Sequence, residues 1–90
     1  MDAESPEDRA RQAFEHAVEH ERAAIEAHEA AADRHEEIAA QQEQAALSAP
    51  DDVRERMTLM AARERDRAET ARQRAEVVRQ RLRDEGVDPD

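Results

Sequence analysis

The sequence contains no cysteine, lysine, tryptophan or tyrosine among its 90 residues. Without cysteine it can form no disulfide and offers no thiolate to a metal ion or a substrate. The only serines, Ser5 and Ser48, suit helix-capping and loop positions, and neither is expected beside a histidine that could activate it. The side chains that usually carry covalent catalysis are scarce, and we therefore predict that the chain is not an enzyme.

Long apolar segments are also missing. No apolar run approaches the roughly 20 residues that cross a membrane, and the acidic start "MDAESPEDRA" lacks the apolar core of a secretory signal peptide. We therefore expect a cytoplasmic protein that does not contact a membrane. All 14 basic residues are arginine and 20 residues are alanine, a bias that indicates a GC-rich bacterial genome.

Glycine and proline are rare in a way that favours long helices. Gly86 is the only glycine, and Pro6 and Pro50 are the only prolines between Ser5 and Glu85. The chain is 42% charged and 38% hydrophobic, and its richness in alanine, glutamate, arginine and glutamine is typical of coiled coils and long helices. High charge with low hydrophobicity is also typical of disorder, but the helical propensity of these residues favours helix.

Local signals divide the chain into two helices. Ser5 can cap a helix that starts at Pro6, and Pro50, within the turn sequence "SAPDD", separates that helix from a second one. Gly86 fits the position just after a helix C-terminus. We predict a single domain over residues 1–90, with a helix over about 6–47, a turn at 48–50, a helix over about 51–85 and a tail at 86–90. The short break favours an antiparallel hairpin, and a single kinked helix is the alternative.

Apolar residues recur in alternating steps of three and four residues in both helices, which is the heptad pattern of a coiled coil. The first series starts at Phe14, and the second includes Met57 and Met60. Polar residues interrupt the seam at Glu21, His28, His35, Gln42 and Glu64. The repeat "HEAAADRHEEIAAQ" (28–41) is therefore a heptad that places histidine on the seam.

Folding the hairpin about residue 49 predicts which residues face each other. Facing residue numbers should add to about 99, so His35 should lie opposite Glu64, and Glu21 should lie within a turn of Arg74 and Arg81. A charge-assisted hydrogen bond between His35 and Glu64 would pair two partly buried polar groups and fix the register.

The distribution of charge favours the same arrangement. Residues 1–47 hold 13 acidic residues and 4 arginines, a net charge of −9, whereas residues 53–83 hold 10 arginines and 5 acidic residues, a net charge of +5. An acidic helix beside a basic one is favoured over two helices of like charge.

A hairpin buries only one side of each helix, and a seam of alanines gives little stability. We therefore expect a homodimer that forms a four-helix bundle. Leu59 and Val77 on the second helix, with Ala23, Ala27 and Ala30 on the first, are candidates for the second interface. The alternative is that they are ordinary surface residues.

The four histidines are candidate metal ligands. His16 and His20, four residues apart on one helix face, suit a divalent transition metal, and in a dimer His28 and His35 of two chains could join Glu64 around an ion. A metal-binding or metal-responsive bundle is therefore an alternative function. A histidine opposite Glu64 could also sense pH, because histidine changes its charge near neutral pH. The other interpretation is that these histidines are polar seam and surface residues without a ligand.

The arginine-rich second helix raises the question of nucleic-acid binding. Its arginines are interleaved with acidic residues, it has no aromatic residue to stack on a base, and the net charge of the chain is −10. Nucleic acid is therefore not the expected partner. The acidic first helix could instead bind a protein with a basic surface, as an adaptor, an inhibitor or an anti-sigma factor does. We predict a non-catalytic protein-interaction or regulatory coiled-coil module.

Two resemblances concern the overall plan of the chain. Over residues 20–40, the "HExAA" repeats resemble small actinobacterial helical-hairpin proteins rich in alanine, glutamate, arginine and histidine, a resemblance that implies no particular activity. The length and the two-helix plan are similar to the small secreted hairpins of the WXG family of Gram-positive bacteria. The turn here is "SAPDD" without Trp-x-Gly, and the tail lacks the tyrosine signal of that family.

Part of the second helix resembles the anti-sigma coiled coils that bind cyclic di-GMP through the motif Glu-x3-Ser-x2-Arg-x3-Gln-x3-Asp. Glu69, Gln80 and Asp84 match the motif in spacing, whereas Gln73 stands at its serine and Glu76 at its arginine. The resemblance implies a cyclic-dinucleotide-responsive, anti-sigma-like hairpin as a second alternative function. The arginine that would contact guanine or phosphate is missing.

Overall fold

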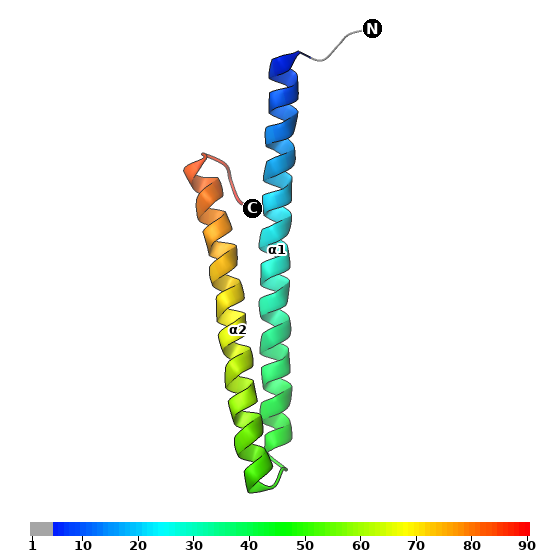
Figure 1. The fold of residues 1–90 in the computed structure, drawn as a ribbon, viewed down its shortest axis with the longest axis vertical. Helices are drawn as coiled ribbons and strands as arrows, with labels where there is room; N and C mark the ends of the chain where they lie inside the picture. The colour runs from blue at the N-terminus through cyan, green and yellow to red at the C-terminus, as the bar shows by residue number, and fades with distance from the viewer. Residues whose placement is uncertain (1–4) are drawn as a thin grey trace.

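The computed structural model describes residues 5–90, which form two α-helices, α1 (Pro6–Ala46) and α2 (Asp51–Asp84). The helices run antiparallel along each other, with the turn at one end of the molecule (Figure 1). This architecture confirms the predicted all-α helical hairpin, and each helix begins and ends within one residue of its predicted limits. The predicted domain over 1–90 includes residues 1–4, which lie outside the described residues.

The hairpin is elongated. Its extents are 73 × 28 × 15 Å and its radius of gyration is 20.5 Å, whereas a compact chain of this length has a radius of gyration of about 12 Å. α1 has 41 residues and α2 has 34, so the first turns of α1 extend beyond the end of α2 (Figure 1). Within residues 5–90, neither helix is both long and apolar enough to span a membrane.

Side chains close both ends of α1. At its start, the hydroxyl of Ser5 accepts a hydrogen bond from the backbone N–H of Asp8 at 3.1 Å, as expected for a helix cap. At its end, Arg54 of α2 donates from Nε to the carbonyl of Ala46 and from Nη2 to the carbonyl of Ala49, both at 3.1 Å. One arginine therefore satisfies carbonyls at the end of α1 and ties the turn to α2.

The C-terminal tail folds back onto α1, which the sequence analysis did not predict. Gly86 has a φ of 77°, and the N–H of Val87 donates to the carbonyl of Leu82 at 2.9 Å, which ends α2 in a Schellman motif. Val87 then packs against the apolar cluster that contains Val18 and Leu82. Arg22 donates to the carbonyl of Asp88 at 2.6 and 3.2 Å. The tail thus covers the open end of the seam.

Alanine makes most of the contact between the helices. The buried residues of α1 recur every seven positions and are Val18, Ile25, Ala32, Ala39 and Ala46. The buried residues of α2 are Ala61, Glu64, Ala68, Ala71, Ala75 and Leu82. Seven of these eleven are alanine, whose small side chain lets two helix backbones approach closely but buries little apolar area.

The seam is narrower than the heptad pattern predicted. Phe14 is 49% exposed, because it lies on the part of α1 that extends past the end of α2. Ile38 and Met60 are 39% and 43% exposed, because they flank the seam instead of lying between the helices. Met57 is half-buried near the turn. Several of the larger apolar side chains are therefore left at the surface.

Candidate functional site

One pair of polar side chains meets across the seam, half-way along the hairpin. Nδ1 of His35 donates to Oε2 of Glu64 at 2.6 Å, in agreement with the predicted register. Arg67 donates to the other carboxylate oxygen of Glu64 at 2.5 Å. Glu64 is the one buried charged residue in the described part of the chain. Both of its oxygens have a donor, which is what a buried carboxylate requires.

These contacts set the protonation state of Glu64. The hydrogen bond from His35 is the largest influence and lowers the pKa of Glu64 below its ordinary value. Burial raises the pKa of Glu64, and the hydrogen bond and charge of Arg67 lower it further. Glu64 is therefore held as the carboxylate that accepts both hydrogen bonds. A shift of register would bury this charge away from His35, so the pair selects one alignment of the helices.

The other polar residues of the seam are less completely paired. Of the two arginines expected near Glu21, Arg81 forms an ion pair with it, in which Nη1 of Arg81 lies 3.7 Å from Oε1 of Glu21. Oε2 of Glu21 and Oε1 of Gln42 are buried without a hydrogen-bond partner among residues 5–90. His28 is half-buried at the same heptad position of α1, one heptad from Glu21 and two from Gln42. The single hairpin thus leaves polar atoms unsatisfied along one flank of the seam.

The five predicted metal ligands lie at separate places on the hairpin. His16 and His20 are exposed on α1, more than about 20 Å along the helix from His35 at 1.5 Å per residue. His28 lies one heptad, about 10 Å, from His35. α1 keeps His16 and His20 one helical turn apart, and His35 and Glu64 are in direct contact at 2.6 Å. In the part of the chain that the structure describes, no three histidine, aspartate or glutamate side chains are placed to hold one ion.

Ion pairs close the other flank of the seam. The acidic residues of α1 and the arginines of α2 both recur every seven residues there, and we call these six residues the ionic ladder: Glu29, Glu36, Glu43, Arg65, Arg72 and Arg79. Arg65 contacts Glu36 at 2.6 Å and also pairs with Glu43, and Arg72 contacts Glu36 at 3.0 Å. The hydrogen bond to Glu43 is the largest influence that raises the pKa of Arg65, so this guanidinium stays charged wherever the chain is folded.

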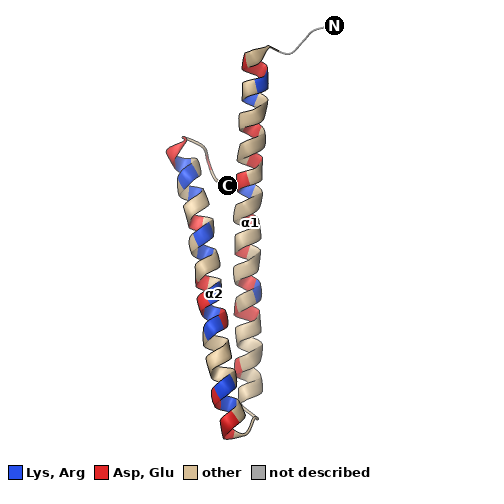
Figure 2. Cartoon of the chain, in the orientation of Figure 1, with Lys and Arg blue, Asp and Glu red and all other residues tan. Residues whose placement is uncertain are grey.

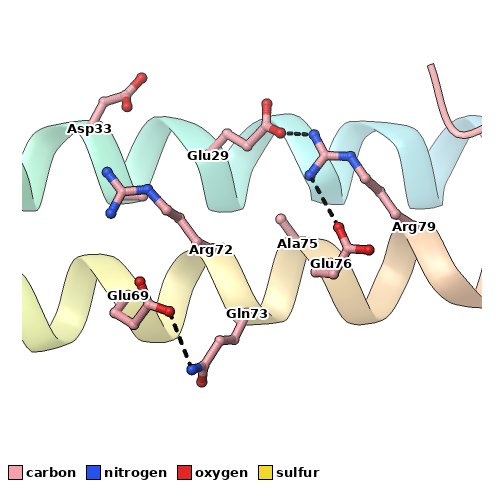
Figure 3. Close-up of a pocket in the computed structure, with 9 residues that line it drawn as sticks. Glu29, Asp33, Glu69, Arg72, Gln73, Ala75, Glu76 and Arg79 are labelled. Carbon is pink, nitrogen blue, oxygen red and sulfur yellow. Dashed lines mark hydrogen bonds and ion pairs between the residues drawn. The ribbon is translucent and has the colours of Figure 1, made fainter.

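A shallow groove of about 580 Å³ runs beside the ionic ladder. Figure 3 shows Arg79 between Glu29 of α1 and Glu76 of its own helix, with Asp33 and Arg72 further along the groove. Residues of both signs line it, namely Glu29, Ala32, Asp33, Glu69, Arg72, Gln73, Ala75, Glu76 and Arg79. The arginines of the groove therefore already have carboxylate partners within the hairpin.

Three of the five positions that resemble the cyclic di-GMP motif, Glu69, Gln73 and Glu76, line this groove. Gln73 donates to Glu69 at 3.4 Å, and Gln80 donates to Asp84 at 2.9 Å. Glu76, which stands at the arginine of the motif, accepts a hydrogen bond from Arg83 at 2.9 Å. The motif residues thus bond to one another and to a neighbour, and a carboxylate occupies the place of the phosphate-binding side chain.

The outward surfaces of the two helices each carry one series of charged residues, and of these residues only Arg67 and Arg81 form ion pairs within the described part of the hairpin, with Glu64 and Glu21. We call one set on α1 the acidic stripe: Glu19, Ala23, Glu26, Ala30, Asp33 and Glu37. We call one set on α2 the basic stripe: Arg63, Arg67, Thr70, Arg74, Val77 and Arg81. All twelve residues are exposed. Within residues 5–90, the four acids of the acidic stripe form no ion pair, and neither do Arg63 and Arg74. Figure 2 shows red residues along α1 and a concentration of blue residues along α2.

The ionic ladder and the two stripes are candidate functional surfaces that were not predicted residue by residue from the sequence. The sequence carries their signal, because Glu29 and Glu36 are spaced by seven, and so are Arg65 and Arg72. The heptad pattern that predicts the seam concerns apolar residues, whereas the ladder follows from the same spacing among charged residues.

Comparison with known proteins gives no relative for this chain: no family model, no curated protein and no solved structure matches it. Geometry and charge are therefore the basis for assigning a function.

Proposed function

We propose that this chain is a protein-interaction module of a regulatory kind, which acts by helix–helix association and performs no chemistry of its own. The supporting observation is the placement of its larger apolar side chains. Val18, Ile25 and Leu82 are buried. Six other large apolar residues are 39–71% exposed, namely Phe14, Ile38, Leu47, Leu59, Met60 and Val77. The hairpin has mostly alanine between its helices and larger apolar side chains on its surface. Those larger side chains gain burial chiefly when a helix from another protein chain packs against them.

The state of the polar groups supports the same proposal. Inside the hairpin, the ionic ladder and the pair of His35 and Glu64 are complete. The acids of the acidic stripe and Arg74 form no ion pair within the described residues 5–90 and lie at the surface. Groups that a single hairpin leaves without partners are available to a second protein surface.

Self-association is the simplest form of this interaction. The hairpin is only 15 Å thick in its shortest direction, so each helix has one neighbour and the rest of its surface faces solvent. Two hairpins would form a four-helix arrangement in which at least one helix of each copy gains another neighbour. We therefore expect a homodimer or a larger assembly of this chain.

Sedimentation equilibrium of the untagged protein tests the proposal. Between about 1 and 100 µM, the average mass should rise with concentration above the 10.2 kDa of one chain. A mass that stays at one chain over the whole range would contradict the proposal. Addition of EDTA should leave the mass unchanged, whereas dissociation on chelation would favour the metal-binding alternative that uses His28 and His35.

A further inference from the structure

Building on the proposed function, we propose that a second copy of this chain docks its acidic stripe along the basic stripe of the first. The two hairpins then lie side by side with their turns at the same end, and α1 of one copy runs antiparallel to α2 of the other. The two lateral edges of the pair differ in charge, because one copy keeps a free acidic stripe and the other keeps a free basic stripe.

The spacing of the charges selects one alignment. Three acids of α1 recur every seven residues, at Glu19, Glu26 and Asp33, and three arginines of α2 do the same, at Arg67, Arg74 and Arg81. When residue numbers of the two copies add to about 100, every acid of the acidic stripe meets an arginine. The pairs are Glu19 with Arg81, Glu26 with Arg74, Asp33 with Arg67, and Glu37 with Arg63.

Alignments shifted by one heptad form fewer of these ion pairs. A shift of one heptad in one direction places Asp33 against Met60, and the opposite shift places Ala40 against Arg67. Each shift loses at least one of the four ion pairs. The favoured alignment between copies also matches the alignment within each hairpin, where the residue numbers of the contacting pair His35 and Glu64 add to 99. The two copies therefore need no displacement along the helix axis.

The apolar residues of the same surfaces agree with this alignment. At a sum of 100, Ala23 faces Val77 and Ala40 faces Met60, so a small side chain meets a large one in both places. At the turn, Leu47 faces Val53. Val77, Met60 and Leu47 are 58%, 43% and 71% exposed in the single hairpin. The charge pattern and the exposed apolar residues point independently to the same second copy.

The interface is heterologous, because it joins two different surfaces, the acidic stripe of one copy and the basic stripe of the other. A heterologous interface that does not close into a ring lets further copies add by the same contact. The smallest assembly is a row of four helices, and further copies add at its acidic or basic edge.

The effect of salt separates this interface from a general apolar one. Each chain has a net charge of −10, so the overall repulsion between two copies weakens as salt is added. The attraction between the stripes weakens as well, and it acts at much shorter range. If the stripes dominate, association falls with rising salt. If apolar contacts dominate, association rises.

Charge reversal provides the direct test, measured by sedimentation velocity in about 50 and 300 mM NaCl. The variant R63E/R74E reverses two of the four arginines of the basic stripe, and the variant E26R/E37R reverses the two acids of the acidic stripe that face them. None of these four residues forms an ion pair within the described part of the chain. Circular dichroism should therefore show unchanged helix content, which controls for folding.

We expect the dissociation constant of each variant alone to rise by more than about tenfold over that of the wild type. The equimolar mixture should associate again, because each reversed stripe then meets a complementary one. Variants that associate as the wild type does would overturn the interface while leaving the proposed function intact. A mixture that stays monomeric would also overturn it. A wild type that binds a labelled DNA duplex through Arg63 and Arg74 without associating would assign the basic stripe to a polyanion instead, and would overturn it as well.

Discussion

His35 and Glu64 meet at 2.6 Å in the middle of an otherwise alanine-rich seam. The side chain of Glu64 is 12% exposed and that of His35 is 32% exposed, so the carboxylate lies inside and the imidazole at the edge. Ala61 and Ala68 flank Glu64 on α2 and are buried. The contact therefore joins two helices whose alanines alone would permit several alignments.

The contribution of Glu64 to stability should depend on pH. Its pKa is lowered in the folded chain, so the stabilisation is fully present above the pKa of the unfolded state and is lost as pH falls through the folded pKa. Glu64→Gln should therefore destabilise the hairpin most near neutral pH, and the difference from the wild type should shrink below about pH 4. Urea denaturation at both pH values measures this difference.

The matched control is Glu69→Gln, which alters an exposed acid of the same helix away from the seam. Its effect at neutral pH should be much smaller. If Glu64→Gln cost the same stability at acidic and neutral pH, the pKa of Glu64 would not be lowered in the folded chain.

The ionic ladder should give a small, salt-sensitive stabilisation. Glu36 contacts both Arg65 and Arg72, so Glu36→Gln should lower the melting temperature by a few degrees at low salt and by less at high salt. Glu15→Gln is the control, because Glu15 has the same heptad position as Glu36 but forms no ion pair within the described part of the chain. Equal effects of the two substitutions would mean that the ladder adds no stability.

The alanine seam should not tolerate larger residues. Ala68 is fully buried, with 0% exposure, and Ala68→Leu should push the helices apart and lower the free energy of unfolding by about 1–3 kcal/mol. Ala62→Leu adds the same atoms at an exposed position of the same helix and should change the free energy of unfolding by less than about 0.5 kcal/mol. Chemical denaturation at low protein concentration compares the two. A stabilising effect of Ala68→Leu would show that the seam is not closely packed.

Gly86 should be required for its backbone conformation. Its φ is 77°, and a Cβ added there would meet nothing within 4 Å, so any cost of substitution comes from the backbone. Gly86→Ala should lower the free energy of unfolding by about 1 kcal/mol. Gly86→Asn should cost less, because asparagine tolerates this region better than alanine does. If both substitutions were neutral, the return of the tail to α1 would not depend on the turn at Gly86.

The helices and their register could be predicted from the sequence because the signals are local or periodic. Ser5 with Pro6, the turn at Pro50 and Gly86 mark the helix ends. The seven-residue spacing of polar residues on the seam, with the position of the turn, gave the pairing of His35 with Glu64.

Other features were predicted incorrectly or not at all, for physical reasons. The heptad pattern placed Phe14 on the seam but does not say where the partner helix ends, and the shorter α2 leaves it exposed. The return of Val87 and Asp88 to α1 depends on long-range contacts that no local pattern reports. The metal-binding alternative stays a prediction: α1 keeps His16 and His20 one turn apart on one face, whereas a metal site needs ligands from several positions at one point.

Every surface described here depends on the antiparallel register, and a pair of spin labels tests it most directly. The chain has no cysteine, so Ala27→Cys with Gln73→Cys places labels at two exposed positions that face the same level of the hairpin. Electron–electron distance measurement, with an excess of unlabelled protein to remove contacts between copies, should give a separation of about 20 Å within one chain. A separation near 70 Å, the length of a continuous helix between the labels at 1.5 Å per residue, would contradict the hairpin and, with it, the ionic ladder and both stripes.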